Sequence, residues 1–199
     1  MYPSNMNPRA FVFFGRSGCG KGTQAKLLKE LLQSKGQEVI YIETGSTFRE
    51  LAKADNLVGV NIRNILQNGF LIPVFLPIWI WTRIIVESFT GKENMILDGV
   101  CRRLEEAVAL ASLFDFYKIE KPNIILMNVS KEWSLQRMME RKRPDDTPET
   151  IENRLGWYER DVLPSVEYFR NKDGYNFIEI NGEQTVDSVH GDIVKSLGY

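Results

Sequence analysis

The residues with the clearest chemical meaning form a glycine-rich segment near the N-terminus, GRSGCGKGT at residues 15–23. It follows an apolar run and precedes a helical pattern, the strand, loop and helix context of a phosphate-binding loop. Glycines let successive backbone N–H groups turn toward a phosphate, and the helix N-terminus adds partial positive charge. Lys21 could then lie along the β- and γ-phosphates of a nucleotide. The general motif has Ser or Thr directly after the lysine, whereas here Gly22 follows and the hydroxyl comes at Thr23.

Charged side chains further along the chain could serve the same phosphates. Asp98 ends an apolar run, and an aspartate at the end of a buried strand can orient magnesium directly or through its waters. Arginines gather around a short loop at residues 141–148. Such a cluster is usually a solvated surface with weak ion pairs, but beside a phosphate-binding loop it favours phosphate binding. The loop has no Cys or His set for structural zinc.

The elements that must position these residues alternate between strand and helix. Short apolar runs predict strands at residues 10–14, 38–42, 94–98, 123–129 and 176–180. Apolar residues at helical spacing predict helices at 21–35, 60–67, 102–116, 131–141, 147–169 and 185–197. This order predicts an α/β fold with a doubly wound parallel sheet, which binds ligands beyond the carboxyl ends of its strands. About fifty residues separate the second and third strands, more than one crossover needs, so an extra helical lobe is expected there.

Several segments, in order along the chain, resemble the adenylate kinase family of nucleoside monophosphate kinases. Residues 15–24 match the family's GxPGxGKGTQ, with Ser17 in place of the proline. The segments TGSTFR (44–49), NGFLIP (68–73) and DGVCR (98–102) resemble TGDLLR, xGxLVP and DGFPR, and residues 137–154 resemble the family's short lid. The resemblance implies a five-stranded P-loop NTPase fold in one domain, residues 1–199. It also implies a helical insert that binds the nucleoside monophosphate (NMP), at about 44–73, and a short lid loop at about 141–147.

The resemblance further implies reversible phosphoryl transfer from ATP to AMP, giving two ADP, with Mg²⁺ as cofactor. The implied ATP-binding residues are Gly15, Ser17, Gly18, Cys19, Gly20, Lys21, Gly22, Thr23 and Arg137. The implied NMP-binding residues are Thr44, Arg49, Gly99, Arg102 and Glu106. Catalysis would use Lys21, Arg102, Arg141, Arg143 and Arg154, and Asp98 and Thr23 would hold the metal directly or through water. Asp145 and Asp146 match an aspartate pair that helps to hold the closed lid, and Thr44 is also expected as a helix N-cap.

One position departs from the family where the acceptor base is read. The family's DGFPRxxxQ glutamine offers one donor and one acceptor, whereas this chain has Glu106. An ionised carboxylate offers acceptors only, which suits the N1–H and N2–H2 donors of guanine and opposes the N1 lone pair of adenine. A protonated Glu106, or a helix shifted in register, would restore AMP as the acceptor. AMP therefore ranks first on similarity over the whole chain, with GMP or another monophosphate as the alternative.

Composition bounds the partners and the compartment. The formal net charge is -1, so no global field would gather nucleic acid or an anionic membrane, and anion binding must come from local clusters. The N-terminus does not read as a secretory signal, so we expect a cytoplasmic monomer with Cys19 and Cys101 as reduced thiols. The apolar stretch FLIPVFLPIWIW (70–81) is too short to span a membrane; it is either the start of a core-facing helix or a docking surface. A non-catalytic nucleotide-binding module is the alternative from another class.

Overall fold

A five-stranded parallel sheet forms the centre of the molecule. The computed structural model describes residues 8–141, 143 and 146–199. The strand order is β2-β3-β1-β4-β5, and every pairing is parallel. The strands are β1 (Ala10–Gly15), β2 (Val39–Glu43), β3 (Asn94–Asp98), β4 (Asn123–Asn128) and β5 (Asn176–Asn181). The predicted sheet is confirmed, with strand ends shifted by at most one residue.

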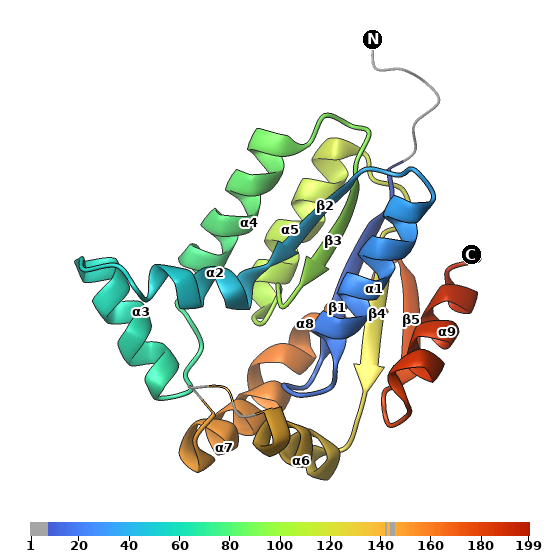
Figure 1. Ribbon diagram of the computed structural model, residues 1–199. Helices are drawn as coiled ribbons and strands as arrows, with labels where there is room; N and C mark the ends of the chain where they lie inside the picture. Colours follow the sequence, from blue (N-terminus) through green and yellow to red (C-terminus); the bar gives the residue numbers. More distant parts are fainter. Residues whose placement is uncertain (1–7, 142, 144–145) are drawn as a thin grey trace.

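Helices cover both faces of this sheet (Figure 1). Alternate residues of β1 pack into two different clusters, Phe11 and Phe13 on one face and Val12 and Phe14 on the other. The first face is covered by α1 (Lys21–Ser34) and α9 (Val186–Ser196), and the second by α4 (Phe75–Ser88), α5 (Leu104–Tyr117) and α8 (Leu163–Arg170). Because strands that are buried on both faces must be apolar throughout, β1 reads as an unbroken apolar run.

The long connection between β2 and β3 contains the expected helical lobe. It consists of α2 (Thr44–Leu51), α3 (Leu57–Gln67) and α4, which share a small core of Phe48, Ile62, Ile72 and Ile80. Helix α3 begins earlier than predicted because the side chain of Asn56 caps it, accepting from Gly59 N at 2.9 Å.

The apolar stretch 70–81 enters α4 and divides between core and surface. Ile80 and Trp81 are buried, as the core-facing interpretation predicted, whereas Phe75 and Trp79 are exposed. Across the described residues, no helix combines the length and the apolar character that crossing a bilayer demands.

The predicted helix at 147–169 is in fact three segments. After α6 (Lys131–Arg141), the chain forms α7 (Pro148–Trp157), a π-helical segment η1 (Tyr158–Val162) and then α8. Pro164 lies in the first turn of α8 and cannot donate a hydrogen bond to the carbonyl four residues earlier. The regular bonding pattern is therefore interrupted just before the proline, and a short π-helix fills the interruption.

Candidate active site

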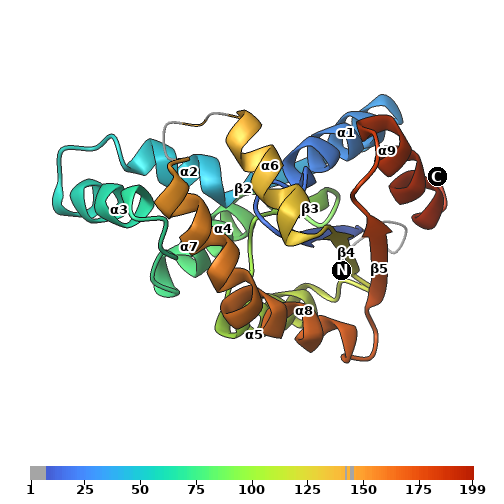
Figure 2. The same ribbon diagram turned by 90° about the horizontal axis from the view of Figure 1, so that it is seen from below.

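A cleft of about 580 Å³ opens where the carboxyl ends of the strands meet the loops that follow them. Seen from that side, α6, α7 and the α2–α3 lobe surround the central strands (Figure 2). The lining of the cleft includes the phosphate-loop residues from Ser17 to Thr23, the end of β3 and arginines from three helices. The cleft therefore lies where the sheet topology predicted a ligand site.

The phosphate loop has the backbone that a close approach to an anion requires. Gly15, Gly18 and Gly20 all have positive φ, at 144°, 88° and 90°. A Cβ at Gly15 would lie 2.7 Å from both Cys19 Sγ and Met127 O, so a side chain cannot be accommodated there. Gly15 therefore allows the loop to pack closely against Met127, and it does not line the cleft.

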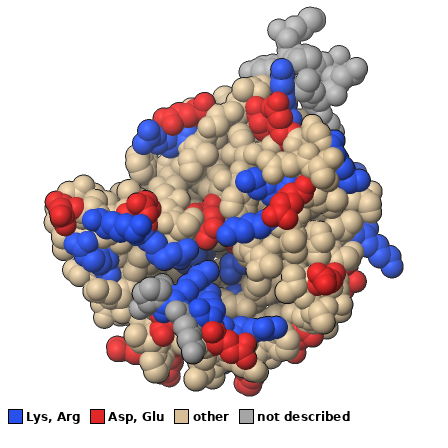
Figure 3. All heavy atoms as spheres, in the orientation of Figure 1, with Lys and Arg blue, Asp and Glu red and all other residues tan. Residues whose placement is uncertain are grey.

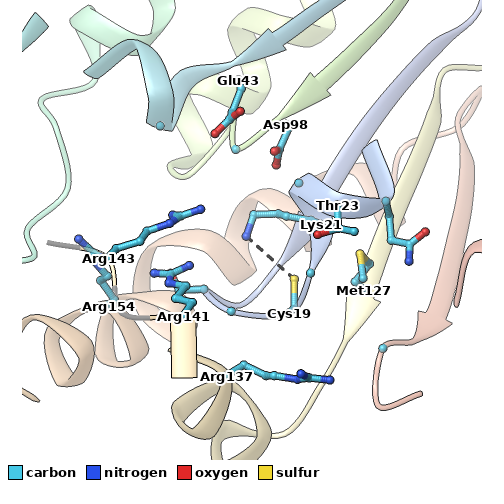
Figure 4. A pocket seen from close by; sticks show the side chains of 18 of the residues that line it. Cys19, Lys21, Thr23, Glu43, Asp98, Met127, Arg137, Arg141, Arg143 and Arg154 are labelled. Atoms are coloured by element: carbon cyan, nitrogen blue, oxygen red, sulfur yellow. Dashed lines mark hydrogen bonds between the residues drawn. The ribbon is translucent and has the colours of Figure 1, made fainter. Parts of the chain in front are cut away.

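Lys21 begins α1 and folds back over this loop. Its ammonium donates to Gly15 O at 3.3 Å and Arg16 O at 3.2 Å, and it lies 4.0 Å from Cys19 Sγ (Figure 4). These neutral partners hold the lysine without neutralising its charge. The charge thus remains available to a phosphate in the cleft.

Two carboxylates face the lysine from the ends of β2 and β3, Glu43 and Asp98 (Figure 4). Asp98 is 5% exposed, and burial raises its pKa, while Lys21 opposes that rise and Glu43 adds to it. A Cβ on Gly22 would lie 2.9 Å from Asp98 Oδ2, so the carboxylate directly adjoins the start of α1. No group of three or more His, Cys, Asp or Glu side chains suited to a metal occurs among the described residues. A metal at Asp98 would therefore need phosphate oxygens or water as further ligands.

One buried aspartate, Asp146, holds two of the lid arginines. Arg141 makes a bidentate contact with Asp146, Nε to Oδ2 at 2.6 Å and Nη2 to Oδ1 at 2.9 Å. Arg154 donates to Asp146 Oδ1 at 2.7 Å, and the Asp146 side chain is 1% exposed. Arg143 lines the same cleft, and all three arginines are drawn around its lid side in Figure 4. The predicted role of Asp146 as a lid anchor fits this geometry, whereas Asp145 lies outside the described residues.

Two more arginines approach the cleft beside Gly45, on the side where the acceptor is expected. A Cβ on Gly45 would lie 3.4 Å from Arg49 Nη1 and 3.9 Å from Arg102 Nη2, so the two guanidinium groups converge there. Arg49 also pairs with Glu43 at 3.3 Å. Arg102 donates from Nε to Gly99 O at 3.1 Å. Burial lowers the pKa of Arg102, and Glu106 and Asp98 oppose that shift.

The expected N-cap at Thr44 is wrong. The N-cap position of α2 is Glu43, without a side-chain capping bond, and Thr44 is the first helical residue. The Thr44 hydroxyl instead donates to Gly99 O at 2.7 Å, across the ends of β2 and β3. The hydroxyl proton of Thr44 is therefore already donated to the backbone and is not directed at a phosphate in the cleft.

Glu106 lies behind the cleft, in a second cavity of about 10 Å³. Thr44, Phe48, Leu71, Ile72, Pro77, Gly99 and Arg102 complete the lining of that cavity. Glu106 is 2% exposed and accepts from Cys101 N at 3.0 Å. Burial raises the pKa of Glu106 to about 7, although Arg102 and the backbone N–H groups of Cys101 and Arg102 favour the charged form. Near neutral pH this carboxyl therefore exchanges between an acid, which can donate, and a carboxylate, which cannot.

The predicted site residues come together with three exceptions. Gly15, Thr44 and Glu106 do not line the main cleft, although Thr44 and Glu106 line the cavity next to it. Arg137 does line it, with its guanidinium 4.9 Å from the ring centroid of Trp133. Both predicted thiols are free and buried.

Sequence reasoning missed several residues that line the cleft. They are Glu43, Trp133, Trp157, Gly182, Gln184 and Val186. The last three follow β5, and Gln24 Nε2 donates to Val186 O at 2.8 Å, which holds that loop beside the phosphate loop. The rule that ligands bind beyond strand ends could have found this loop. No motif indicated the two tryptophans.

A phosphate loop on a parallel sheet, in a cleft that arginines also line, defines a P-loop phosphotransferase. The family model of adenylate kinase matches residues 13–174. An adenylate kinase of Cyanothece sp. is 34% identical over 188 residues, covering 92% of this chain and 91% of that protein. The adenylate kinase of Corynebacterium aurimucosum is 30% identical and covers 94% of this chain and 98% of its own. That of Prochlorococcus marinus is 31% identical and covers 96% of this chain and 99% of its own. The chain belongs to the adenylate kinase family and is a nucleoside monophosphate kinase.

Proposed function

We propose that this chain transfers the terminal phosphoryl group of ATP to AMP, forming two ADP, within a single domain with an acceptor lobe at about 44–73. One observation carries the proposal. Lys21, the lid arginines Arg141, Arg143 and Arg154, and a second pair, Arg49 and Arg102, all line one cleft. A protein that only bound ATP would not need the second pair of arginines, so this arrangement favours transfer over a regulatory binding module.

Positioning and charge would supply most of the catalysis. The loop amides and Lys21 would hold the β- and γ-phosphates, while Arg49 and Arg102 would hold the acceptor phosphate. Arg141, Arg143 and Arg154 would stabilise the charge that spreads over the transferring group. Phosphoryl transfer between oxygens needs no enzyme nucleophile, so no phosphoenzyme is expected. Lid and acceptor lobe would exclude water from the cleft.

Asp98 and Thr23 would hold magnesium, directly or through water. The donor set fits this ion, because Mg²⁺ usually takes one or two carboxylates together with substrate phosphates and water. When bound, the ion would neutralise charge on the phosphates.

Glu106 supports GMP as a second acceptor. Its ionised form would match the donors of guanine and its protonated form the N1 acceptor of adenine. The pKa of about 7 makes both forms accessible near neutral pH. We rank AMP first, because the relatives named above are adenylate kinases along nearly their whole length. The substrates are the only partners we propose, for a monomer in the cytoplasm.

The test is a panel of AMP, GMP, CMP, UMP and deoxynucleoside monophosphates with ATP and Mg²⁺, with the diphosphates separated and measured. AMP should be converted, and Lys21→Ala should lower kcat by about 100-fold or more. Folded protein that retains ATP but phosphorylates no monophosphate would contradict the proposal.

A further inference from the structure

Trp157, the last residue of α7, contacts two parts of the acceptor side at once. Its side chain is largely buried, and its indole Nε1 donates to Gly69 O at 3.0 Å. On its face, the guanidinium carbon of Arg102 lies 5.6 Å from the ring centroid, within the range of a cation–π interaction. One side chain therefore joins the turn that ends the acceptor lobe to the arginine expected to hold the acceptor phosphate.

The turn at Asn68 and Gly69 fits closely against α7. Asn153 Nδ2 donates to Asn68 O at 2.9 Å, next to the carbonyl that the indole binds. Gly69 has φ of 65°, and a Cβ there would lie 2.7 Å from Thr150 O, so only glycine allows this approach. Figures 1 and 2 both place the end of α3 beside α7.

We propose that Trp157 is a positioning residue that couples the seating of the acceptor lobe on α7 to the placement of Arg102. This inference rests on the proposed contact of Arg102 with the acceptor phosphate. The bond to Gly69 O fixes the plane of the indole ring, and the ring face limits where the guanidinium can lie. Arg102 donates from Nε to Gly99 O, so its two Nη groups are the ones that can reach a phosphate.

A purely structural role would require only the volume of the ring. The indole N–H matters because α7 covers Gly69 O, and a buried carbonyl without a hydrogen-bond donor destabilises the folded state. Phenylalanine would keep the ring face for Arg102 and remove the donor, whereas leucine would remove both. The two contacts can therefore be separated by substitution.

The experiment measures steady-state kinetics with AMP and ATP varied in turn, for Trp157→Phe, Trp157→Leu and Asn153→Ala. We expect Trp157→Phe to raise the KM for AMP about three- to tenfold, the typical loss for one hydrogen bond, and to leave the KM for ATP within about twofold. Trp157→Leu should in addition lower kcat by about three- to tenfold, because Arg102 loses its support. Asn153→Ala removes the neighbouring bond to the turn and should raise only the KM for AMP. Trp157→Phe decides the coupling if the leucine variant does not fold.

The matched control is Trp79→Phe. Trp79 is exposed on α4, and Arg83 lies over its ring at 5.6 Å, the same distance as Arg102 from Trp157. This control should leave both KM values unchanged. The inference is overturned if Trp157→Phe behaves like the control or raises the KM for ATP and AMP equally.

Arg102→Lys separates this inference from the proposed function. If that variant retains the AMP affinity of the unmodified protein, the proposed role of Arg102 fails. If it loses AMP affinity while Trp157→Phe and Asn153→Ala do not, only the coupling through Trp157 fails.

Discussion

Glu106 is a buried carboxyl group, and its titration should change the stability of the protein with pH. Burial raises its pKa from 4.5 to about 7. Below about pH 4.5 both the folded and the unfolded state hold the proton, so this group makes no difference to stability. Between about pH 4.5 and 7 only the folded state keeps the Glu106 proton, so the free energy of unfolding falls as pH rises. Above 7 both states are ionised, and the cost of burying the charge is fully present.

Glu106→Gln should therefore stabilise the protein at high pH and not at low pH. We expect the free energy of unfolding to increase by about 2–3 kcal/mol at pH 8, with little change near pH 4.5. Urea unfolding of both proteins at the two pH values measures this. Glu105→Gln, one residue earlier on the exposed surface of α5, is the control and should change neither value. An equal gain at both pH values would show that the carboxyl is not buried in its charged form.

The same titration should change which base is accepted. As pH rises through about 7, the ratio of kcat/KM for AMP to that for GMP should fall, because the donor to adenine N1 is lost. In Glu106→Gln the ratio should become independent of pH and favour AMP. The measurement is kcat/KM for both monophosphates from pH 6 to 8. An unchanged base preference in the variant would mean that Glu106 does not read the base.

At the scale of elements, the predictable part of the structure is the part that short stretches of sequence determine. β1, the phosphate loop and α1 are continuous in sequence, so Lys21 could be placed from its neighbours alone. Asp98 could be placed because parallel strands bring their carboxyl ends to one edge. Trp157 could not, because its role depends on a turn 88 residues away in sequence. The break at η1 depends on one proline within an otherwise helical pattern, and apolar spacing alone does not reveal it.

In the described part of the lid, one side chain links two arginines. Asp146 holds Arg141 and Arg154 together with three short hydrogen bonds. Asp146→Asn would lose the charge and the bidentate geometry, so both arginines should lie further from their working positions. We expect kcat to fall by about ten- to a hundredfold, because misplacement by about 1 Å can cost that much.

A comparison variant for the lid is Asp161→Asn in η1. Asp161 pairs with the exposed Arg160 at 2.7 Å, away from the cleft. Its kcat should stay within about twofold of the unmodified protein, because exposed ion pairs contribute little. Steady-state kinetics at saturating ATP and AMP distinguishes the two variants. Equal kcat values would refute the role given to Asp146.

Helix α6 is tied to the phosphate loop through Ser134. This residue is fully buried, and its hydroxyl donates to Ser17 O. Ser134→Ala would leave that carbonyl without its donor, so we expect the free energy of unfolding to fall by about 1–2 kcal/mol. The KM for ATP should rise more than the KM for AMP, because the carbonyl belongs to the phosphate loop. Ser34→Ala, which removes an exposed hydroxyl bond at the end of α1, is the control. Thermal unfolding and KM measurements test both, and an unchanged KM for ATP would contradict the prediction.

At the scale of the whole molecule, charge is distributed in a way that the net value of -1 conceals. Lys and Arg side chains gather around the hollow between the acceptor lobe and the lid in Figure 3, with a few acidic groups beside them and others spread over the remaining surface in view. Arg49, Arg102, Arg141, Arg143 and Arg154 all line the cleft with Lys21. Walls of low dielectric on either side concentrate the field of these cations, so a nearly neutral protein can still attract nucleotides.

Salt should therefore weaken substrate binding despite the balanced composition. Raising KCl from about 50 to about 300 mM should increase the KM for AMP and for ATP by about three- to tenfold, because the Debye length shortens from well over 10 Å to a few ångströms. A neutral osmolyte at equal osmolarity should leave both KM values unchanged, which excludes effects of water activity. If both KM values stayed constant across this range, the cluster of cations would act only by direct contact and not by attraction at a distance.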